Sequence, residues 1–365
     1  MAISFGGSSI GRPGAFSVVD TSDMIPLTVG AQKVLAFVGE AKDANVETDV
    51  TKVLYFNSPK HAREALGTGS LLKHMETAWK HGADLIAVSV VKGSGALGAL
   101  QDEDWDSAID RFETETVHAI IPVSTSGAVQ VKVDTHNSFM SNVTQRKERR
   151  GFYGHEAGLD VTAIKALKTS LNGERVVFAS PAVYTEEASG RVLQPSTILA
   201  SAYAGIWAKL EPQVPITYKY VSFAGLERKY TGVEIADLLS EGVAVTEHVE
   251  GKGLRIVQGV TGATGTKDLT QVELSVSYIK DLTSQNLREQ LEDKFTGQAG
   301  VAGIETSIHN YIGTILDEFV RQGWIRSYDP QKVNLIRFGT TFDIEWEGSP
   351  TLPINNFLIT SRFKL

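Results

Sequence analysis

The sequence of 365 residues contains no cysteine. Disulfide bonds, thiol nucleophiles, iron–sulfur clusters and cysteine-based zinc sites are therefore all excluded. It also lacks an apolar run close to the roughly 20 residues that a membrane-spanning helix needs. Its most apolar stretches, 85–91 and 117–123, are far shorter. We therefore expect no membrane insertion, and the range of possible chemistry is narrow.

An excess of positive charge is also missing. There are 35 Lys and Arg against 43 Asp and Glu, a net charge of -8, which gives no general attraction for nucleic acid or an anionic membrane. The basic run 146–150 (RKERR) has no interleaved aromatic residues. We place it at a helix C-terminus, where cations complement the helix dipole. The first 16 residues lack the apolar core of a secretory signal, so we expect a protein made in the cytosol. From the charge and the basic run we expect no binding of nucleic acid.

Motifs of catalytic sites are incomplete. Residues 7–11 match G-x-S-x-G, but this motif needs a strand before its serine and a helix after it, and here it stands in a glycine-punctuated stretch. Residues 259–267 (GVTGATGTK) resemble a phosphate loop, but the lysine does not directly follow the last glycine. We interpret them as a flexible interdomain turn. The eight histidines show no metal-ligand spacing. We predict no catalytic, cofactor or metal site.

Residues 26–262 alternate apolar segments with amphipathic ones. The predicted strands are 33–38, 52–57, 84–91, 117–123 and 175–180. One helix is predicted to begin after Ser58-Pro59, and further helices are predicted over 71–81, 137–149, 159–171 and 197–210. Strands without polar alternation, separated by helices, indicate a parallel sheet that is covered on both faces. We predict an α/β, Rossmann-like outer domain here.

Residues 263–365 follow a different, α+β pattern. Residues 271–280 (QVELSVSYIK) alternate as in a strand, and helices are predicted after Thr283 or Ser284 and over 305–322. Residues 342–347 (FDIEWE) form an alternating strand with an acidic outer face, and 357–365 form another with a basic outer face. Opposite charges favour a hairpin of these two strands across the 348–356 loop. This is a mixed inner domain with an extended C-terminal strand.

Residues 1–25 form an arm punctuated by glycine and proline, with one short β-prone segment at 15–20. An isolated strand cannot satisfy its own backbone hydrogen bonds, so it needs a partner sheet in the same chain or in another one. Terminal strands on tethers suit β-augmentation, in which a segment of one chain completes the sheet of a neighbour. The two ends of the chain therefore point to assembly.

The order of these features resembles the contractile tail sheath proteins of bacteriophages, R-type tailocins and related injection particles. The segments that carry the resemblance are 12–16 (RPGAF), 34–40 (VLAFVGE), 196–209 (STILASAYAGIWAK), 243–245, 259–261 and 323–325 (GWI) with the strands after them. The family's aspartate-glycine-x-tryptophan and tryptophan-glycine-x-arginine stretches are not recognisable. The short chain suggests a near-minimal sheath without extra outer domains.

The resemblance implies a structural subunit without a cofactor. It implies hexameric rings that stack helically around a tail tube, assemble in the host cytoplasm in a metastable extended state, and become part of the virion tail. Contraction, triggered by the baseplate, drives the tube through the host envelope. The implied partners are further copies of the chain, the tail tube protein, and the baseplate and tail terminator proteins.

The resemblance also implies exchange of terminal strands between subunits. The residues expected in that exchange are Arg12, Pro13, Phe16, Val18, Phe342, Ile344, Trp346, Phe357, Ile359 and Phe363. The polar face of helix 305–322, with Asp317, Glu318 and Arg321, is a candidate tube-facing surface. Packing into the subunit's own core explains the seven apolar positions of that helix equally well.

Two alternatives remain. A Rossmann-like small-molecule enzyme requires a glycine-rich turn after its first strand, but the turn after 117–123 reads STSG. Another tail or baseplate protein is the second alternative, although a tube subunit is expected to be smaller and mostly β.

Overall fold

The computed structural model describes residues 3–5, 8–10, 33–41, 51–92, 100–266 and 268–355. The chain divides into two units, 1–31 and 32–365. In the first unit, β1 (Ile3–Phe5) and β2 (Ser8–Ile10) pair as an antiparallel hairpin, with Ser9 of the G-x-S-x-G match opposite Ser4. The predicted arm strand at 15–20 lies outside the described residues, together with Arg12, Pro13, Phe16 and Val18.

The second unit is built on a nine-stranded sheet with the order β11-β14-β13-β8-β7-β6-β3-β5-β4. Its strands are β3 (Leu35–Glu40), β4 (Leu54–Phe56), β5 (Ile86–Val91), β6 (Ala119–Pro122), β7 (Arg150–Tyr153), β8 (Val176–Ser180), β11 (Tyr220–Val221), β13 (Val243–Val249) and β14 (Gly253–Ile256). The run from β13 to β5 is parallel, and antiparallel strands flank it on both sides. The predicted parallel sheet is confirmed.

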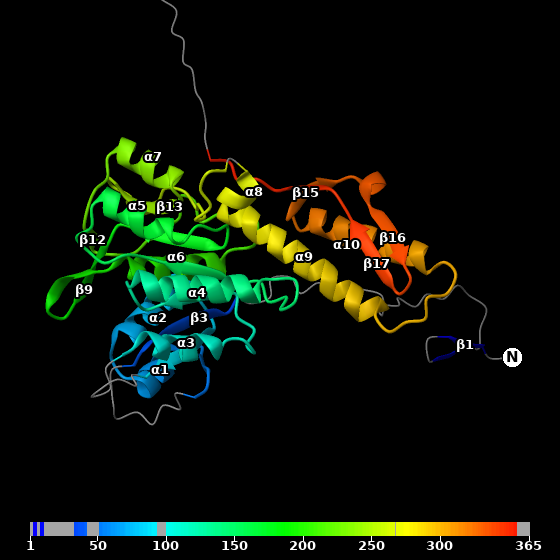
Figure 1. Ribbon diagram of the computed structural model, residues 1–365, viewed down its shortest axis with the longest axis horizontal. Helices are drawn as coiled ribbons and strands as arrows, with labels where there is room; N and C mark the ends of the chain where they lie inside the picture. Colours follow the sequence, from blue (N-terminus) through cyan, green and yellow to red (C-terminus); the bar gives the residue numbers. More distant parts are fainter. Residues whose placement is uncertain are drawn as a thin grey trace, which may run out of the picture. The chain divides into compact units, whose positions relative to one another are not determined.

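Helices cover both faces of this sheet (Figure 1). The first face carries α1 (Pro59–Leu66), α2 (Ser70–Lys80) and α6 (Ser196–Lys209), and the second carries α3 (Asp102–Asp110), α4 (Gly127–Met140), α5 (Val161–Thr169) and α7 (Gly232–Ser240). Alternate residues of β3 enter the two cores: Leu35 and Phe37 one, Ala36 and Val38 the other. A strand that is buried on both faces reads as an unbroken apolar run.

A smaller sheet with the order β10-β9-β12 joins β9 (Val183–Glu187), β10 (Gly190–Gln194) and β12 (Gly225–Leu226). The predicted helix at 137–149 is wrong, because α4 begins at Gly127 and ends at Met140. Beyond it, the Asn142 side chain accepts hydrogen bonds from the backbone of Thr144 and Gln145 and forms a turn. Asparagine stabilises such turns with its side-chain oxygen.

The predicted strand at 271–280 is also wrong. This stretch forms α8 (Leu269–Val272) and the start of α9 (Leu274–Phe295). All six residues of 274–279 are buried, including Ser275 and Ser277. The alternation of apolar and small polar residues therefore does not separate a buried face from an exposed one, and the period of two carried no information on strand formation.

The segment 259–262 is not a flexible turn. It is buried and tied into the fold, because the Gly262 nitrogen donates to the Val176 carbonyl at 2.7 Å and Gly259 accepts from Leu274 at 2.9 Å. The segment lies between β14 and α8, and its hydrogen bonds connect β8 with the start of α9. None of the helices in the described part of the chain is long and apolar enough to cross a membrane.

The C-terminal part contains α10 (Ile304–Arg321) packed against α9, followed by β15 (Ile325–Tyr328), a 3-10 turn (Pro330–Lys332), β16 (Asn334–Phe338), β17 (Thr341–Glu345) and β18 (Gly348–Pro350). The predicted helix at 305–322 is confirmed. The acidic strand alternates as predicted, but in the described residues β17 pairs with β16, and β18 in the predicted loop pairs with β15. Phe357, Ile359 and Phe363 lie outside the described residues.

Helices α2 and α6 cross so closely that Gly205 is required. A Cβ built on Gly205 would lie 2.4 Å from the carbonyl oxygen of Ala78. We predict that Gly205→Ala pushes the two helices apart and lowers the free energy of unfolding by about 1–3 kcal/mol in urea titrations. Gly232→Ala is the control, because a Cβ built on this helical glycine meets no neighbouring atom within 4 Å. Equal stability of the two variants would contradict this assignment.

Candidate functional site

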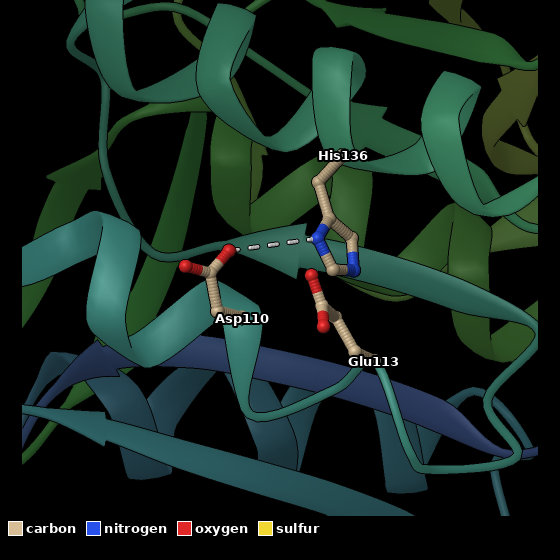
Figure 2. Close-up of side chains that lie close together, drawn as sticks. All are labelled: Asp110, Glu113 and His136. Carbon is tan, nitrogen blue, oxygen red and sulfur yellow. Dashed lines mark ion pairs between the residues drawn. The ribbon is translucent and has the colours of Figure 1, made fainter.

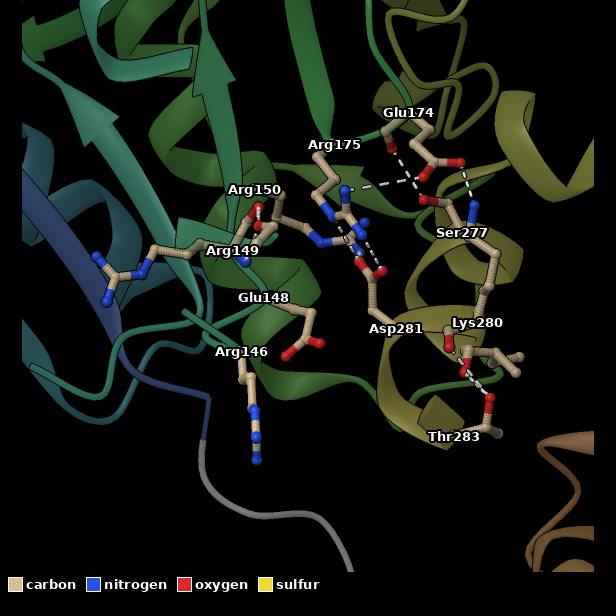
Figure 3. A network of polar contacts seen from close by, with 12 residues as sticks. Arg146, Glu148, Arg149, Arg150, Glu174, Arg175, Ser277, Lys280, Asp281 and Thr283 are labelled. Carbon is tan, nitrogen blue, oxygen red and sulfur yellow. Dashed lines mark hydrogen bonds and ion pairs between the residues drawn. The ribbon is translucent and has the colours of Figure 1, made fainter. Parts of the chain in front are cut away.

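Two arginines from the sheet converge on one carboxylate of α9 (Figure 3). Arg150 begins β7 and donates to Asp281 at 3.0 Å, and Arg175, next to β8, donates to both oxygens of Asp281 at 3.0 and 2.5 Å. Arg150 and Asp281 are almost fully buried. The prediction that the basic run 146–150 lies at a helix C-terminus is therefore wrong. The run lies in the connection that leads into β7 and faces α9.

This cluster fixes the position of α9 on the sheet. Burial lowers the pKa of Arg150, and the charge of Asp281 opposes that shift. The guanidinium also lies 5.5 Å from the ring centre of Trp207 and 5.0 Å from that of Tyr278. Because a buried charge is tolerated only with partners, α9 cannot shift along the sheet without exposing or isolating these groups.

Further polar contacts continue along the same side of α9. Ser277 donates to the backbone oxygen of Glu174 at 2.9 Å, and Lys280 pairs with the Glu174 side chain. Arg288 donates to Glu148 at 3.0 and 3.1 Å, and Glu292 pairs with Arg146. Glu174 and the 146–150 connection thus meet one face of α9 that extends over about four turns, from Ser277 to Glu292. We call the contacts of Arg150, Arg175, Glu174, Ser277 and Asp281 the α9 joint.

A possible metal-binding group lies elsewhere, where Asp110 and Glu113 at the end of α3 approach His136 of α4 (Figure 2). One ligand atom from each lies within 4.8 Å of the others. Arg149 donates to Nε2 of His136 at 3.0 Å, and because arginine is only a donor, the ring proton belongs on Nδ1. That nitrogen faces Asp110 at 4.0 Å. It offers a proton and no lone pair, so the group does not fit a metal ion.

A serine–histidine pair at the carboxyl end of β8 bears on the enzyme alternative. Ser180 lies 3.0 Å from Nε2 of His155 and 2.8 Å from the hydroxyl of Tyr230, and Nδ1 of His155 lies 2.6 Å from the backbone oxygen of Glu156. A nucleophile and its base have this arrangement. However, Ser180 is 0% exposed and His155 is 1% exposed. No substrate reaches them, and the pair serves the core.

The predicted tube-facing residues do not share one environment. Asp317 and Arg321 are exposed on α10, but Glu318 is buried and accepts hydrogen bonds from Arg321 and Gln322 at 2.5 and 2.6 Å. Glu318 therefore fixes the last turn of α10 and does not belong to the exposed polar face. Asp317 accepts from the hydroxyl of Tyr328 at 2.8 Å.

The predicted exchange residues in β17 and directly after it share one face, where Phe342, Ile344 and Trp346 are half-buried. Strand β16, which sequence reasoning missed, lies beside them and exposes 50% of Ile336 and 63% of Phe338. A two-residue loop, Gly339-Thr340, joins Phe338 to Thr341, and its glycine has a φ of 63°. A glycine in such a short loop is the sequence signal that predicts this hairpin. The predicted strand is thus one half of a two-stranded hairpin, whose other strand is β16.

The α9 joint predicts a large effect for one substitution. Asp281→Ala leaves two arginines without their buried counter-charge, and we expect it to lower the free energy of unfolding by about 3–5 kcal/mol. Asp237→Ala removes a more exposed ion pair with Lys165 and should cost about 1 kcal/mol or less. Urea titrations of both variants against the parent chain measure the difference. If the two losses are alike, the joint does not hold α9.

Four buried histidines predict acid sensitivity. Burial lowers the pKa of His74, His118, His136 and His155 to about 4, whereas the unfolded chain protonates near its ordinary value of about 6.5. Below that value the unfolded state binds more protons, so stability falls as the pH drops from 6.5 toward 4. We expect a loss of several kcal/mol between pH 7 and 5 in urea titrations. A constant unfolding midpoint over that range would contradict it.

Comparison with known proteins gives a consistent result. No family model matches the chain. It is 27% identical over 273 residues to the tail sheath protein of Bacillus phage SP01, covering 74% of this chain and 47% of that protein. It is 24% identical over 252 residues to the tail sheath protein of Staphylococcus phage Twort, covering 68% and 42%. The chain spans about half the length of the curated relatives it matches.

Solved structures match over more of their length. The contracted helical sheath of the anti-feeding prophage has a TM-score of 0.73 at 12% identity, covering 97% of this chain and 99% of that one. The sheath tail protein of Desulfitobacterium hafniense has a TM-score of 0.71 at 12% identity, covering 93% and 97%. These likenesses show the fold, and the curated relatives add the sequence relationship. The chain is therefore similar in sequence to curated tail sheath proteins and similar in fold to solved contractile sheaths.

Proposed function

We propose that this chain is the structural subunit of a contractile tail sheath. It polymerises around a tail tube in a metastable extended state and contracts to drive the tube through a host envelope. The observation that carries the proposal is the likeness to a contracted sheath over almost the full length of both chains. The sealed Ser180–His155 pair gives the enzyme alternative no support.

The proposed assembly follows the family. Subunits form hexameric rings that stack helically in the host cytoplasm and become part of the virion tail, where the tail tube, baseplate and tail terminator proteins are the partners. Residues 1–25 are the exchange arm, 26–262 the outer domain and 263–365 the inner domain. No cofactor is required, because the energy is stored in subunit packing.

The proposed mechanism is a shift between two packings of the same subunits. A trigger at the baseplate lowers the barrier, and the contracted lattice is favoured because it buries more surface between subunits. Such a change needs subunits that move as intact bodies. The α9 joint supports this, because its buried ion pairs hold α9 to the sheet while the contacts between subunits change.

Strand exchange is the proposed link between subunits. Arg12, Pro13, Phe16 and Val18 belong to the donated arm, and Phe357, Ile359 and Phe363 to the C-terminal strand. The small sheet of β16 and β17, with Phe342, Ile344 and Trp346, supports the proposal as the acceptor. An isolated two-stranded hairpin is marginally stable and gains from added strands. About five ladder hydrogen bonds at ~0.5–1.5 kcal/mol each would contribute several kcal/mol for each donated strand.

The experiment that tests this function uses two truncations. Deletion of 1–20 removes the proposed donated strand, and we expect a folded protein that forms no tubes in negative-stain electron microscopy. Deletion of 1–10 removes β1 and β2 but leaves 12–18 in place, and this control should still polymerise. Tubes formed by the longer truncation would refute strand exchange. Absence of tubes from the full chain, under conditions that keep it folded, would refute the sheath proposal.

Tube contact by α10 is proposed for its exposed residues Asp317 and Arg321. The double variant Asp317→Asn with Arg321→Gln removes both charges but keeps an acceptor for Tyr328 and a donor for Glu318. We expect it to preserve sheath polymers but to abolish their co-sedimentation with tail tubes. Glu318→Ala should instead lower the stability of the subunit, because Glu318 is buried. Normal tube binding by the double variant would show that another face contacts the tube.

A further inference from the structure

The two terminal segments of the chain begin at opposite ends of the sequence, but their first described residues are fixed near the same stretch of helix. Lys33 directly follows the N-terminal segment, and Asn355 directly precedes the C-terminal one. Both residues contact groups within or beside Glu273–Asp281, the N-cap and first two turns of α9. Nothing in the sequence spacing indicates this convergence.

Lys33 is anchored by its ammonium group. Its Nζ donates to the backbone oxygens of Trp207 and Leu210 at the end of α6, at 2.9 and 2.5 Å. The same atom lies 4.9 Å from the ring centres of Trp207 and Tyr278, which pack edge to face 5.0 Å apart. The helix C-terminus and the two rings favour the charged ammonium group, against burial and the charge of Arg150, which lower the pKa of Lys33 to about 7. Lys33 is only 6% exposed, so this anchor lies inside the fold.

Asn355 is anchored on Glu273. Its Nδ2 donates to Oε2 of Glu273 at 3.2 Å, and Gln258 donates to the same oxygen at 3.2 Å. Glu273 is 1% exposed, and burial raises the pKa of its carboxyl group. The other carboxyl oxygen has no hydrogen-bond partner in the described structure. Burial of a carboxyl group with one unpaired oxygen costs free energy, so a structural role for Glu273 is expected.

The sheet is attached to this same stretch of helix through the α9 joint. Ser277 contacts Glu174, and Asp281 holds Arg150 and Arg175. Glu273 and Tyr278 are five residues apart, about 7.5 Å along a helix axis. The α9 residues that contact both terminal segments and the sheet thus lie within about two turns of the helix.

We propose that Lys33 and Glu273 are positioning residues that fix the roots of the two exchanged strands on the start of α9, so that tension from neighbouring subunits enters the body there. This inference rests on the proposed strand exchange. A pull on either terminal segment meets a buried side-chain anchor before it reaches the ladder of β3 or of β18. The Lys33 anchor joins the end of α6 to Tyr278 of α9, and the Glu273 anchor lies at the N-cap of α9. Because α9 is itself held to the sheet, opposed pulls act over a short distance and the subunit moves as a whole.

The test uses full-length Lys33→Met, Glu273→Ala and the double variant. Lys33→Met keeps the apolar stem and removes the hydrogen bonds. Glu273→Gln, which keeps an acceptor oxygen for Asn355, and Lys165→Met, which removes an ion pair remote from α9, are the matched controls. Hydrogen exchange of the unassembled protein reports on anchoring, and the lengths of sheath tubes before and after contraction report on tension.

We expect the double variant to fold and assemble, with at least tenfold faster amide exchange at 34–36 and 351–355 and with tubes that break into shorter pieces on contraction. The controls should match the parent chain in both measurements. Parent-like exchange and unbroken tubes in the double variant would overturn the inference. If the parent chain forms no tubes, the proposed function fails, and unchanged exchange in the variants would then overturn the anchoring separately.

Discussion

The carboxylate of Asp281, buried between Arg150 and Arg175, is the interaction on which the arrangement of the second unit depends. The sheet could be covered by its own helices α1 to α7 without α9. What brings the C-terminal part into a defined place is a charged contact that tolerates little displacement, because Arg150 and Asp281 are both buried and each needs the other as a partner. Apolar packing of Leu274 and Tyr278 adds area to this contact, whereas the ion pairs add direction.

The chain uses reactive side chains for structure. Ser180 and His155 have the geometry of a nucleophile and its base, but they are sealed in the core by Tyr230 and Phe178. His136 stands beside two carboxyl groups, but Arg149 fixes its ring proton on the side that a metal would need. In both places burial and hydrogen bonding satisfy the polar atoms completely enough that no reaction partner is needed. This agrees with the proposed role in assembly, which needs no reactive side chain.

The parallel sheet was predictable from the sequence, since β3, β5, β6 and β8 are buried on both faces and read as unbroken apolar runs. Helix α10 was predictable from its spacing. The start of α9 was not, because Ser275 and Ser277 are buried with their apolar neighbours and mimic the alternation of a strand. The joint itself was not predictable either. Arg150 and Asp281 are 131 residues apart, and a basic run in the sequence does not show which carboxylate it will meet.

The nine-stranded sheet ends in strands of three and two residues, β4 and β11. A long exposed edge invites pairing with any other chain, and short edge strands limit this hazard. The edges of the largest sheet therefore offer few unpaired backbone groups for aggregation at high protein concentration. In the proposed polymer of identical copies, this leaves small sheets such as β16–β17 as the places where backbone pairing between subunits can occur.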